Sequence, residues 1–382
     1  MSEDTEEAID DITQHLIMMV KQDGSDMFLH VGAPITIKAH KKFMRLKPVL
    51  KPGDVERIAY NFMADEKRKI FEKHRQVDFA ISIPRLGRFR ANLFRQRGEA
   101  SLVIRYIDTK VPTMEQLKLP PVLGDFALDK NGLVIVIGAT GSGKSTTLAA
   151  MINKRNAETE SHIITLEDPI EFVHDHIKSL VAQREIGTDC DSFEDGIIAA
   201  MREAPDVILL GEIRNQETMD YALKFANTGH LALSTLHAND AVSAMDRIIG
   251  FYPKEVQEQE CARIAENLRG VVAQRLVPTV DGKMAAALEV MVNTPRITDL
   301  IKKREMGEIK GAIKEGQQYQ MQTFDQALLS LYQQNRVSME QALRFADSKT
   351  DLKLSIKLAE SSPGDDDGLG GMTQMEQEED YN

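Results

Sequence analysis

The sequence predicts an α/β protein, and three patterns along its 382 residues support this prediction. From residue 130 onward, short apolar segments at 133–137, 163–166, 207–210 and 231–235 alternate with helical patterns. Such alternation is typical of a mostly parallel sheet covered by helices. Before residue 110 the patterns indicate a smaller α+β unit, and after about residue 255 the chain reads as mostly helical.

The smaller unit begins with a helix over 10–20, where apolar side chains recur at helical spacing. Two short strands, in GSDMFLHVG and PITIKAH, follow and are separated by a Gly-Ala-Pro turn. The rest of the unit is predicted as a helix over roughly 53–74 and strands near 77–83, 87–95 and 101–107.

The domain organisation follows from these patterns. We expect an N-terminal domain over 1–110 and a proline-containing linker over 111–130. We expect a core over 131–358 that ends in a helical hairpin at 323–357, and an acidic tail over 359–382. The tail is poor in hydrophobic residues and is expected to be disordered.

The formal net charge of −12 belongs to the chain ends. Residues 1–20 carry six acids and residues 358–382 carry eight, and neither stretch contains Lys or Arg. Without these 14 acids, 45 acidic residues face 47 basic ones. The near-neutral body and the aromatic content of 5% provide no continuous basic path or stacking platform, so no nucleic-acid partner is expected.

The clearest motif follows the apolar run at 133–137. The run GATGSGKS, from Gly138 to Ser145, satisfies G-x-x-x-x-G-K-[ST] between a strand and a helix. Glycines let backbone N–H groups surround phosphate oxygens, and the helix N-terminus adds positive potential there. The motif therefore predicts ATP and Mg²⁺ as cofactors. The predicted nucleotide-binding residues are Gly138, Ala139, Thr140, Gly141, Ser142, Gly143, Lys144, Ser145 and Thr146.

Within this motif, Lys144 is expected to reach the β- and γ-phosphates, and the Ser145 hydroxyl is expected to ligate Mg²⁺. Thr147 need only pack. Acids follow two of the other strands: Glu167, Asp168 and Glu171 after one, and Glu212 after another. Because ligands of open parallel sheets lie at the carboxyl ends of the strands, these acids could hold Mg²⁺ or orient water. Taken alone, Glu212 could equally be a helix-capping acid.

Histidines and arginines add less specific signals. His230 and His237 lie seven residues apart across a strand and could occupy its two ends. Either could sense a γ-phosphate, or one could be a core histidine and the other a surface histidine. Six arginines lie between 85 and 105. They indicate either an exposed basic strand or arginine fingers from the same or a neighbouring subunit, with Arg90 and Arg105 preferred.

These motifs together resemble the secretion ATPase superfamily. GATGSGKST, TLEDPIEF, DVILLGEIRNQETMDYAL and TGHLALSTLHAND are similar in order and spacing to its Walker A, Asp box, Walker B and His box. RFRANLFRQRG resembles its N-domain arginine segment. The likeness covers roughly residues 12–355 and points to the type IV pilus retraction ATPases.

The resemblance implies a PAS-like N-terminal α+β domain followed by a RecA-like P-loop ATPase core with a helical C-terminal region, assembled as a homo-hexamer. It implies Glu212 as the catalytic carboxylate, Glu167 as a second one, and His230 and His237 as phosphate-sensing positions. Gly211 stands where a general P-loop protein has Asp, as in the secretion family. This makes Glu167 a more plausible contributor to the metal site.

Two traits resemble the accessory branch of the family, whose members act with a paralogous principal motor. TPRITDLIKK (Thr294–Lys303) keeps only part of the C-terminal motif of the principal motor, and the chain continues into the acidic tail. The implied function is assistance to pilus retraction and twitching motility. It would be exerted at the inner-membrane pilus base, with indirect action on the membrane platform protein.

Other functions remain open from the sequence. The chain could be the principal retraction motor, or a mainly structural ring subunit whose own hydrolysis is dispensable. Pilus-extension and type II secretion ATPases usually carry a larger N-terminal region and a tetracysteine zinc motif, and this sequence has neither; its two cysteines form no CxxC pair. Without a signal-peptide pattern or a bilayer-length apolar stretch, a cytoplasmic protein is expected.

Overall fold

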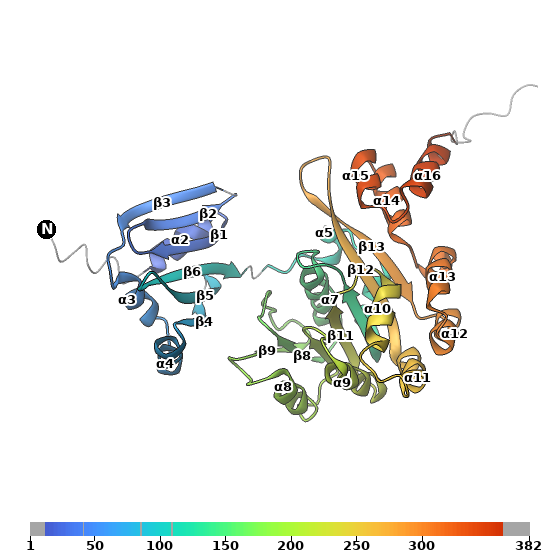
Figure 1. Cartoon of the computed structure of the whole chain (residues 1–382), viewed down its shortest axis with the longest axis horizontal. Helices are drawn as coiled ribbons and strands as arrows, with labels where there is room; N and C mark the ends of the chain where they lie inside the picture. The colour runs from blue at the N-terminus through green and yellow to red at the C-terminus, as the bar shows by residue number, and fades with distance from the viewer. Residues whose placement is uncertain (1–11, 41, 85, 108–109, 362–382) are drawn as a thin grey trace, which may run out of the picture.

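The computed structural model contains two β-sheets, each with its own helices (Figure 1). It describes residues 12–40, 42–84, 86–107 and 110–361. Arg85 of the arginine cluster, the first two residues of the expected N-terminal helix and the tail from 362 onward lie outside the described residues. Among the described residues, no helix combines the length and apolar character needed to cross a bilayer.

The first sheet is six-stranded and antiparallel, in the order β3-β2-β1-β6-β5-β4. Alternate residues such as Met27, Leu29, Leu102 and Ile104 are buried in one core, as expected for a sheet with one covered face. Its elements are α2 (Thr13–Lys21), β1 (Gly24–His30), β2 (Pro34–Ala39), β3 (Lys42–Val49), α3 (Asp54–Tyr60), α4 (Asp65–His74), β4 (Gln76–Ile83), β5 (Gly87–Gln96) and β6 (Glu99–Ile107).

The strands predicted in this unit are confirmed, and two details differ. Edge strand β3 was not predicted; Lys42, Arg45 and Lys47 interrupt its apolar residues, so they show no regular alternation. The single helix expected over 53–74 is two helices, since the chain leaves helical geometry before Ala64, which is extended (φ −65°, ψ 153°). The PAS-like character of this unit stays a prediction.

Residues between the sheets form two short helices, α5 (Met114–Leu117) and α6 (Val122–Leu128). The segment was expected to be a linker, yet much of it is packed. Leu123 is fully buried and Phe126 is 4% exposed, in one core with Val134 and Met151. Phe126 lies so close to Gly270 that a Cβ there would be 2.3 Å from its ring. The second half of this segment therefore belongs structurally to the second sheet.

The second sheet is seven-stranded, in the order β13-β12-β7-β11-β10-β8-β9. Every neighbouring pair is parallel except β12 with β13, which confirms the predicted mostly parallel sheet. Its elements up to β11 are β7 (Gly132–Ile137), α7 (Lys144–Glu158), β8 (His162–Glu167), β9 (Leu180–Glu185), α8 (Phe193–Ala200), β10 (Val207–Leu210), α9 (Gln216–Asn227) and β11 (Leu231–Leu236).

Helices cover both faces of this sheet (Figure 1). On β7, Val134 and Val136 pack in the core that contains α6 and α7. Leu133, Ile135 and Ile137 point the other way, into the core shared with α8 to α16. Because β7 is buried on both sides, it consists entirely of apolar residues after Gly132, as is usual for a central parallel strand.

The chain after residue 255 is mostly helical, as expected, but it also contains two strands that were not predicted. Strands β12 (Leu268–Pro278) and β13 (Met284–Val292) form a hairpin, and β12 extends the sheet beside β7. Polar residues inside both strands obscure their alternation in the sequence. The remaining helices are α10 (Ala241–Ile249), α11 (Gln257–Asn267), α12 (Pro295–Lys303), α13 (Ile309–Glu315), α14 (Phe324–Gln333), α15 (Met339–Phe345) and α16 (Lys349–Ser361), with 3₁₀ turns at Met306–Glu308 and Gln317–Tyr319. The predicted helical hairpin at 323–357 is thus three helices, and the last of them runs to Ser361.

The packing of α6 predicts the effect of truncating its aromatic residue. Phe126→Ala should lower the free energy of unfolding of the second-sheet unit by about 3 kcal/mol, because it leaves a cavity beside Gly270. The measurement is guanidinium unfolding, with the exposed Leu358→Ala on α16 as control. Equal stabilities of the two variants would mean that this segment is a free linker.

Candidate active site

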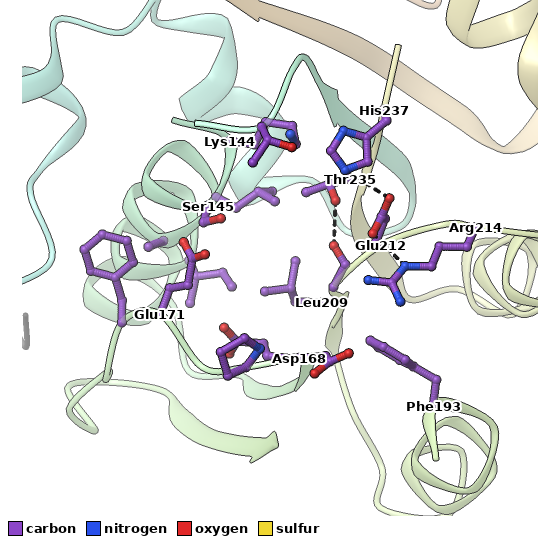
Figure 2. A pocket seen from close by; sticks show the side chains of 18 of the residues that line it. Lys144, Ser145, Asp168, Glu171, Phe193, Leu209, Glu212, Arg214, Thr235 and His237 are labelled. Atoms are coloured by element: carbon purple, nitrogen blue, oxygen red, sulfur yellow. Dashed lines mark hydrogen bonds and ion pairs between the residues drawn. The ribbon is translucent and has the colours of Figure 1, made fainter. Parts of the chain in front are cut away.

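The predicted phosphate loop and the acids after the other strands meet at one edge of the second sheet. Strands β7, β8, β10 and β11 are parallel, so their carboxyl ends lie together. There they surround a cavity of about 330 Å³ (Figure 2). Its lining includes Thr140, Gly141, Lys144, Ser145, Glu167, Asp168, Glu171, His174, Glu212, Arg214, Thr235 and His237.

The loop between β7 and α7 has the backbone geometry that its glycines predict. Gly138, Gly141 and Gly143 have φ values of 148°, 76° and 87°. A Cβ on Gly138 would lie 2.5 Å from the Gln274 carbonyl oxygen, so a side chain there would clash with β12. Helix α7 starts at Lys144, which places its free N–H groups and positive dipole end at the cavity.

A buried glutamine on β12 braces this loop from behind. Gln274 is 3% exposed, and its Nε2 donates to the Ser142 carbonyl oxygen at 2.8 Å. Its Oε1 accepts from the Thr147 hydroxyl at 2.7 Å. Thr147 therefore does more than pack: together with Gln274 it connects α7, the loop and β12.

The Lys144 ammonium group is folded onto its own loop. Its Nζ donates to the carbonyl oxygens of Gly138 at 2.8 Å and Ala139 at 3.0 Å. Burial lowers the pKa of Lys144, while the charges of Glu212 and Glu171 act in the opposite direction. Phosphate oxygens entering the cavity would offer this cation a stronger, charged partner than the two carbonyls.

Glu212, directly after β10, is held at both carboxylate oxygens. Its Oε1 lies 3.2 Å from His237 Nε2, and its Oε2 accepts from Arg214 Nε at 2.7 Å. The side chain is 17% exposed. In Figure 2, Glu212 and His237 lie together on one side of the cavity, and Ser145 and Glu171 lie on the opposite side. This is a suitable arrangement for orienting a water molecule near a phosphate bound at α7.

Glu167, the last residue of β8, is a second fixed carboxylate. Its Oε1 accepts from the Thr165 hydroxyl at 2.7 Å and from Gln183 Nε2 at 3.1 Å. Burial raises the pKa of Glu167, and these two hydrogen bonds oppose the rise. Gln183, on β9, also donates to the Phe172 carbonyl oxygen at 2.8 Å and accepts from the His174 N–H at 2.8 Å. It thereby ties Glu167 to the cavity wall.

The donor atoms at the cavity fit Mg²⁺. Ser145 provides a hydroxyl, and Glu167 and Glu171 provide carboxylates, which are the hard oxygen ligands that this ion takes. Within the described residues, no group of three or more His, Cys, Asp and Glu side chains could hold a metal by itself. In nucleotide sites Mg²⁺ usually takes only one or two protein oxygens and completes its shell with substrate phosphates and water.

His230 lies away from the cavity of its own chain, so its proposed phosphate-sensing role stays a prediction. It precedes β11, whose first residue pairs with Gly132 at the start of β7, whereas the phosphate loop follows the end of β7. His230 and His237 are thus separated by the length of β11, roughly 20 Å. The His230 ring contacts Thr228 and the edge of Phe225 instead. Of the two histidines, His237 is the one at the cavity.

Arg90 and Arg105 do not line the cavity of their own chain. Arg90 lies 3.8 Å from Asp78 on the first sheet, and Arg105 forms an ion pair with Asp26 at 2.8 Å. A finger role within the same subunit is therefore not supported by this arrangement.

A third arginine of the cluster connects the two sheets. Arg88 Nη2 donates to Glu185 Oε2 at 3.0 Å, and the same oxygen accepts from the Ile170 N–H at 3.3 Å. Ile170 follows Asp168 and Pro169, which line the cavity. The first sheet is thereby linked to a cavity wall.

The other predicted nucleotide-binding residues occupy the loop and the start of α7. Gly138, Ala139 and Ser142 line a second hollow of about 370 Å³ on the other side of the loop, next to Arg275 and Phe345. Gly143 and Thr146 line neither space. The sequence analysis missed Gln183, Gln274 and Arg214. Of these three residues, only Arg214 could have been found from the sequence, because it lies two residues after the predicted catalytic Glu212.

Comparison with known proteins identifies similar sequences over almost the whole chain. The model of the family "Type II/IV secretion system protein" matches residues 1–362. The type IV pilus ATPase PilU of Pseudomonas aeruginosa is 47% identical over 94% of this chain and 94% of its own length. The type IV pilus retraction ATPase PilT of the same organism is 40% identical over 87% of this chain and 97% of its own.

The fold has a close counterpart among solved structures. A crystal structure of the pilus retraction motor PilT with bound ADP matches with a TM-score of 0.85 and 37% sequence identity. The match covers 90% of this chain and 99% of that one. The α/β architecture described above is therefore similar to that of a nucleotide-binding protein.

The contacts of Gln183 predict a selective defect. Gln183→Leu should lower kcat for ATP hydrolysis about tenfold, because Glu167 loses a donor and a fixed position. The affinity for ATP should change little, because Lys144 and the loop are untouched. The measurement is steady-state phosphate release with a separate nucleotide-binding assay. Gln333→Leu, at an exposed position of α14, is the matched control. An unchanged kcat in Gln183→Leu would contradict the role given to this clamp.

Proposed function

The chain belongs to the type II/IV secretion system protein family, and we propose that it is an ATP-hydrolysing motor that drives retraction of type IV pili. The observation that carries this proposal is the position of Glu212, held by Arg214 and His237, in the same cavity as Lys144 and Ser145. The similarity to PilU and PilT supports the biological side of the proposal.

The chemistry follows from these contacts. Triphosphate oxygens replace the carbonyls of Gly138 and Ala139 as partners of Lys144, and backbone N–H groups of the loop and α7 surround them. Glu212 accepts a proton from the attacking water, while His237 and Arg214 keep its carboxylate aimed at the γ-phosphate. Ser145 and Glu167 would hold Mg²⁺, which neutralises charge on the phosphates when bound.

Coupling to motion requires a connection between the cavity and the first sheet. The contacts from Arg88 through Glu185 to Ile170 provide one, because they join β5 to the segment after Glu167. Loss of the γ-phosphate removes the charge that holds Lys144 and the surrounding groups. The segment at 168–171 can then shift, and the first sheet with it.

We further propose a homo-hexameric ring in the cytoplasm at the inner-membrane pilus base, acting with a PilT-like paralogue and through it on the membrane platform protein. In such a ring, Arg90 or Arg105 would be available as a finger for the cavity of a neighbouring subunit, since neither lines its own. The PilU-like accessory role rests on the relatives and on the partial C-terminal motif. The native mass of the purified chain with ATP tests the ring: a monomeric mass would rule it out.

The deciding experiment for the biological role is complementation of a deletion strain. The strain should lose most twitching motility, and the wild-type gene should restore it. The Lys144→Ala variant should fail to restore it, because the β- and γ-phosphates of ATP lose the lysine that binds them. Normal pilus retraction without the protein would discard the role. Restoration by Lys144→Ala would instead favour a structural ring subunit. Retraction in a strain that lacks the PilT-like paralogue would make this chain a principal motor.

A further inference from the structure

A buried carboxyl group outside the cavity contacts the helix that follows His237. Glu289 lies in β13, is 1% exposed, and its Oε1 accepts from the Ala241 N–H at 2.8 Å. Ala241 is the first residue of α10. Glu289 therefore satisfies one of the free N–H groups at this helix start and lies at the positive end of its dipole.

The start of α10 is joined to the active site by only a few residues. Strand β11 ends at Leu236, His237 follows, and Asp240 caps α10 by accepting from the Ser243 N–H at 2.7 Å. Arg247, on the same helix, donates to the His237 carbonyl oxygen at 2.9 Å. A displacement of the start of α10 would therefore displace His237, and with it the contact to Glu212.

Charged groups surround Glu289 on several elements. Burial, with the nearby charges of Asp240 and Asp347, raises its pKa to about 7, and Lys310 of α13 opposes this. Asp347, in the connection from α15 to α16, forms ion pairs with Lys310 at 2.7 Å and Arg275 at 2.6 Å. Two N–H groups of this connection donate to Asp325 of α14.

This set of charges also reaches the phosphate loop. Arg275 lines the second hollow together with Gly138 and Ser142. Glu289 thus lies near two parts of the molecule. One is the start of α10, which follows His237, and the other is the set of ion pairs in which Asp347 connects α13 to Arg275 of β12. A movement of either part can therefore reach the other through Glu289.

We propose that Glu289 is a positioning residue for ATP hydrolysis: through the start of α10 it keeps His237 in contact with Glu212. The inference rests on the proposed function, because it requires that His237 contributes to turnover. Glu289 itself does not line the nucleotide cavity, so its effect must pass through α10. The charged form is the better acceptor for the Ala241 N–H and the better partner for the helix dipole.

The test compares Glu289→Gln and Glu289→Leu with Glu158→Gln, an exposed ion-pair residue at the far end of α7, in the purified full chain. Glu289→Gln keeps an oxygen acceptor and loses only the charge, whereas Glu289→Leu loses both. We expect kcat to fall about tenfold or more in Glu289→Leu and less in Glu289→Gln, with KM for ATP within about twofold of wild type. Glu158→Gln should match wild type.

The pH profile separates positioning from a structural role. At low pH wild-type Glu289 is protonated and resembles glutamine, so the kcat ratio of wild type to Glu289→Gln should be near one. As pH rises through about 7 the wild-type carboxyl ionises, and the ratio should increase and then level off. A ratio that stays at one throughout overturns the proposal, even if Glu289→Leu fails to fold.

His237→Ala distinguishes the two failures. If this variant keeps wild-type kcat, the proposed role of His237 is wrong, and the inference about Glu289 falls with it. If His237→Ala is slow but both Glu289 variants match wild type, only the inference about Glu289 is refuted. A slow His237→Ala with a pH-dependent Glu289→Gln supports both.

Discussion

The site depends on one geometric constraint: parallel strands of a single sheet end at the same edge. Register places the ends of β7, β8, β10 and β11 side by side, and each strand delivers its polar residues just beyond its last buried position. The phosphate loop, Glu167, Glu212 and His237 meet for this reason, although up to 99 positions separate them in the chain. The buried apolar residues of the strands stabilise the fold, and the polar residues at the strand ends line the cavity.

Polar side chains inside the protein then hold these ends in place. Gln274 braces the phosphate loop, Gln183 fixes Glu167, and Glu289 holds the helix after His237. Each is buried or partly buried and is hydrogen-bonded to backbone or side-chain groups, as buried polar groups must be to offset the loss of water. Removing one of them leaves a partner group unsatisfied and frees a part of the cavity wall.

Features that depend on a short local pattern could be predicted from the sequence. The strand, loop and helix around Lys144 and the acids after the strands could be recognised because each lies within a short stretch of chain. The β12–β13 hairpin could not, because Gln274, Arg275 and Glu289 interrupt its apolar pattern. Gln274 contacts the loop and Glu289 contacts α10 across more than 45 positions, so their roles arise only from tertiary packing. Chain spacing alone likewise did not show that His237, and not His230, lies at the strand end that faces the cavity.

The central claim is that Glu212 prepares water for attack on a nucleotide held by Lys144. The most direct measurement is the identity of the nucleotide that stays bound after incubation with ATP and Mg²⁺, determined by quenching and chromatography. Wild-type protein should retain ADP, and Glu212→Gln should retain ATP, with turnover slower by a factor of about 100 or more. If Glu212→Gln retains ADP and releases phosphate at the wild-type rate, Glu212 does not perform the chemical step.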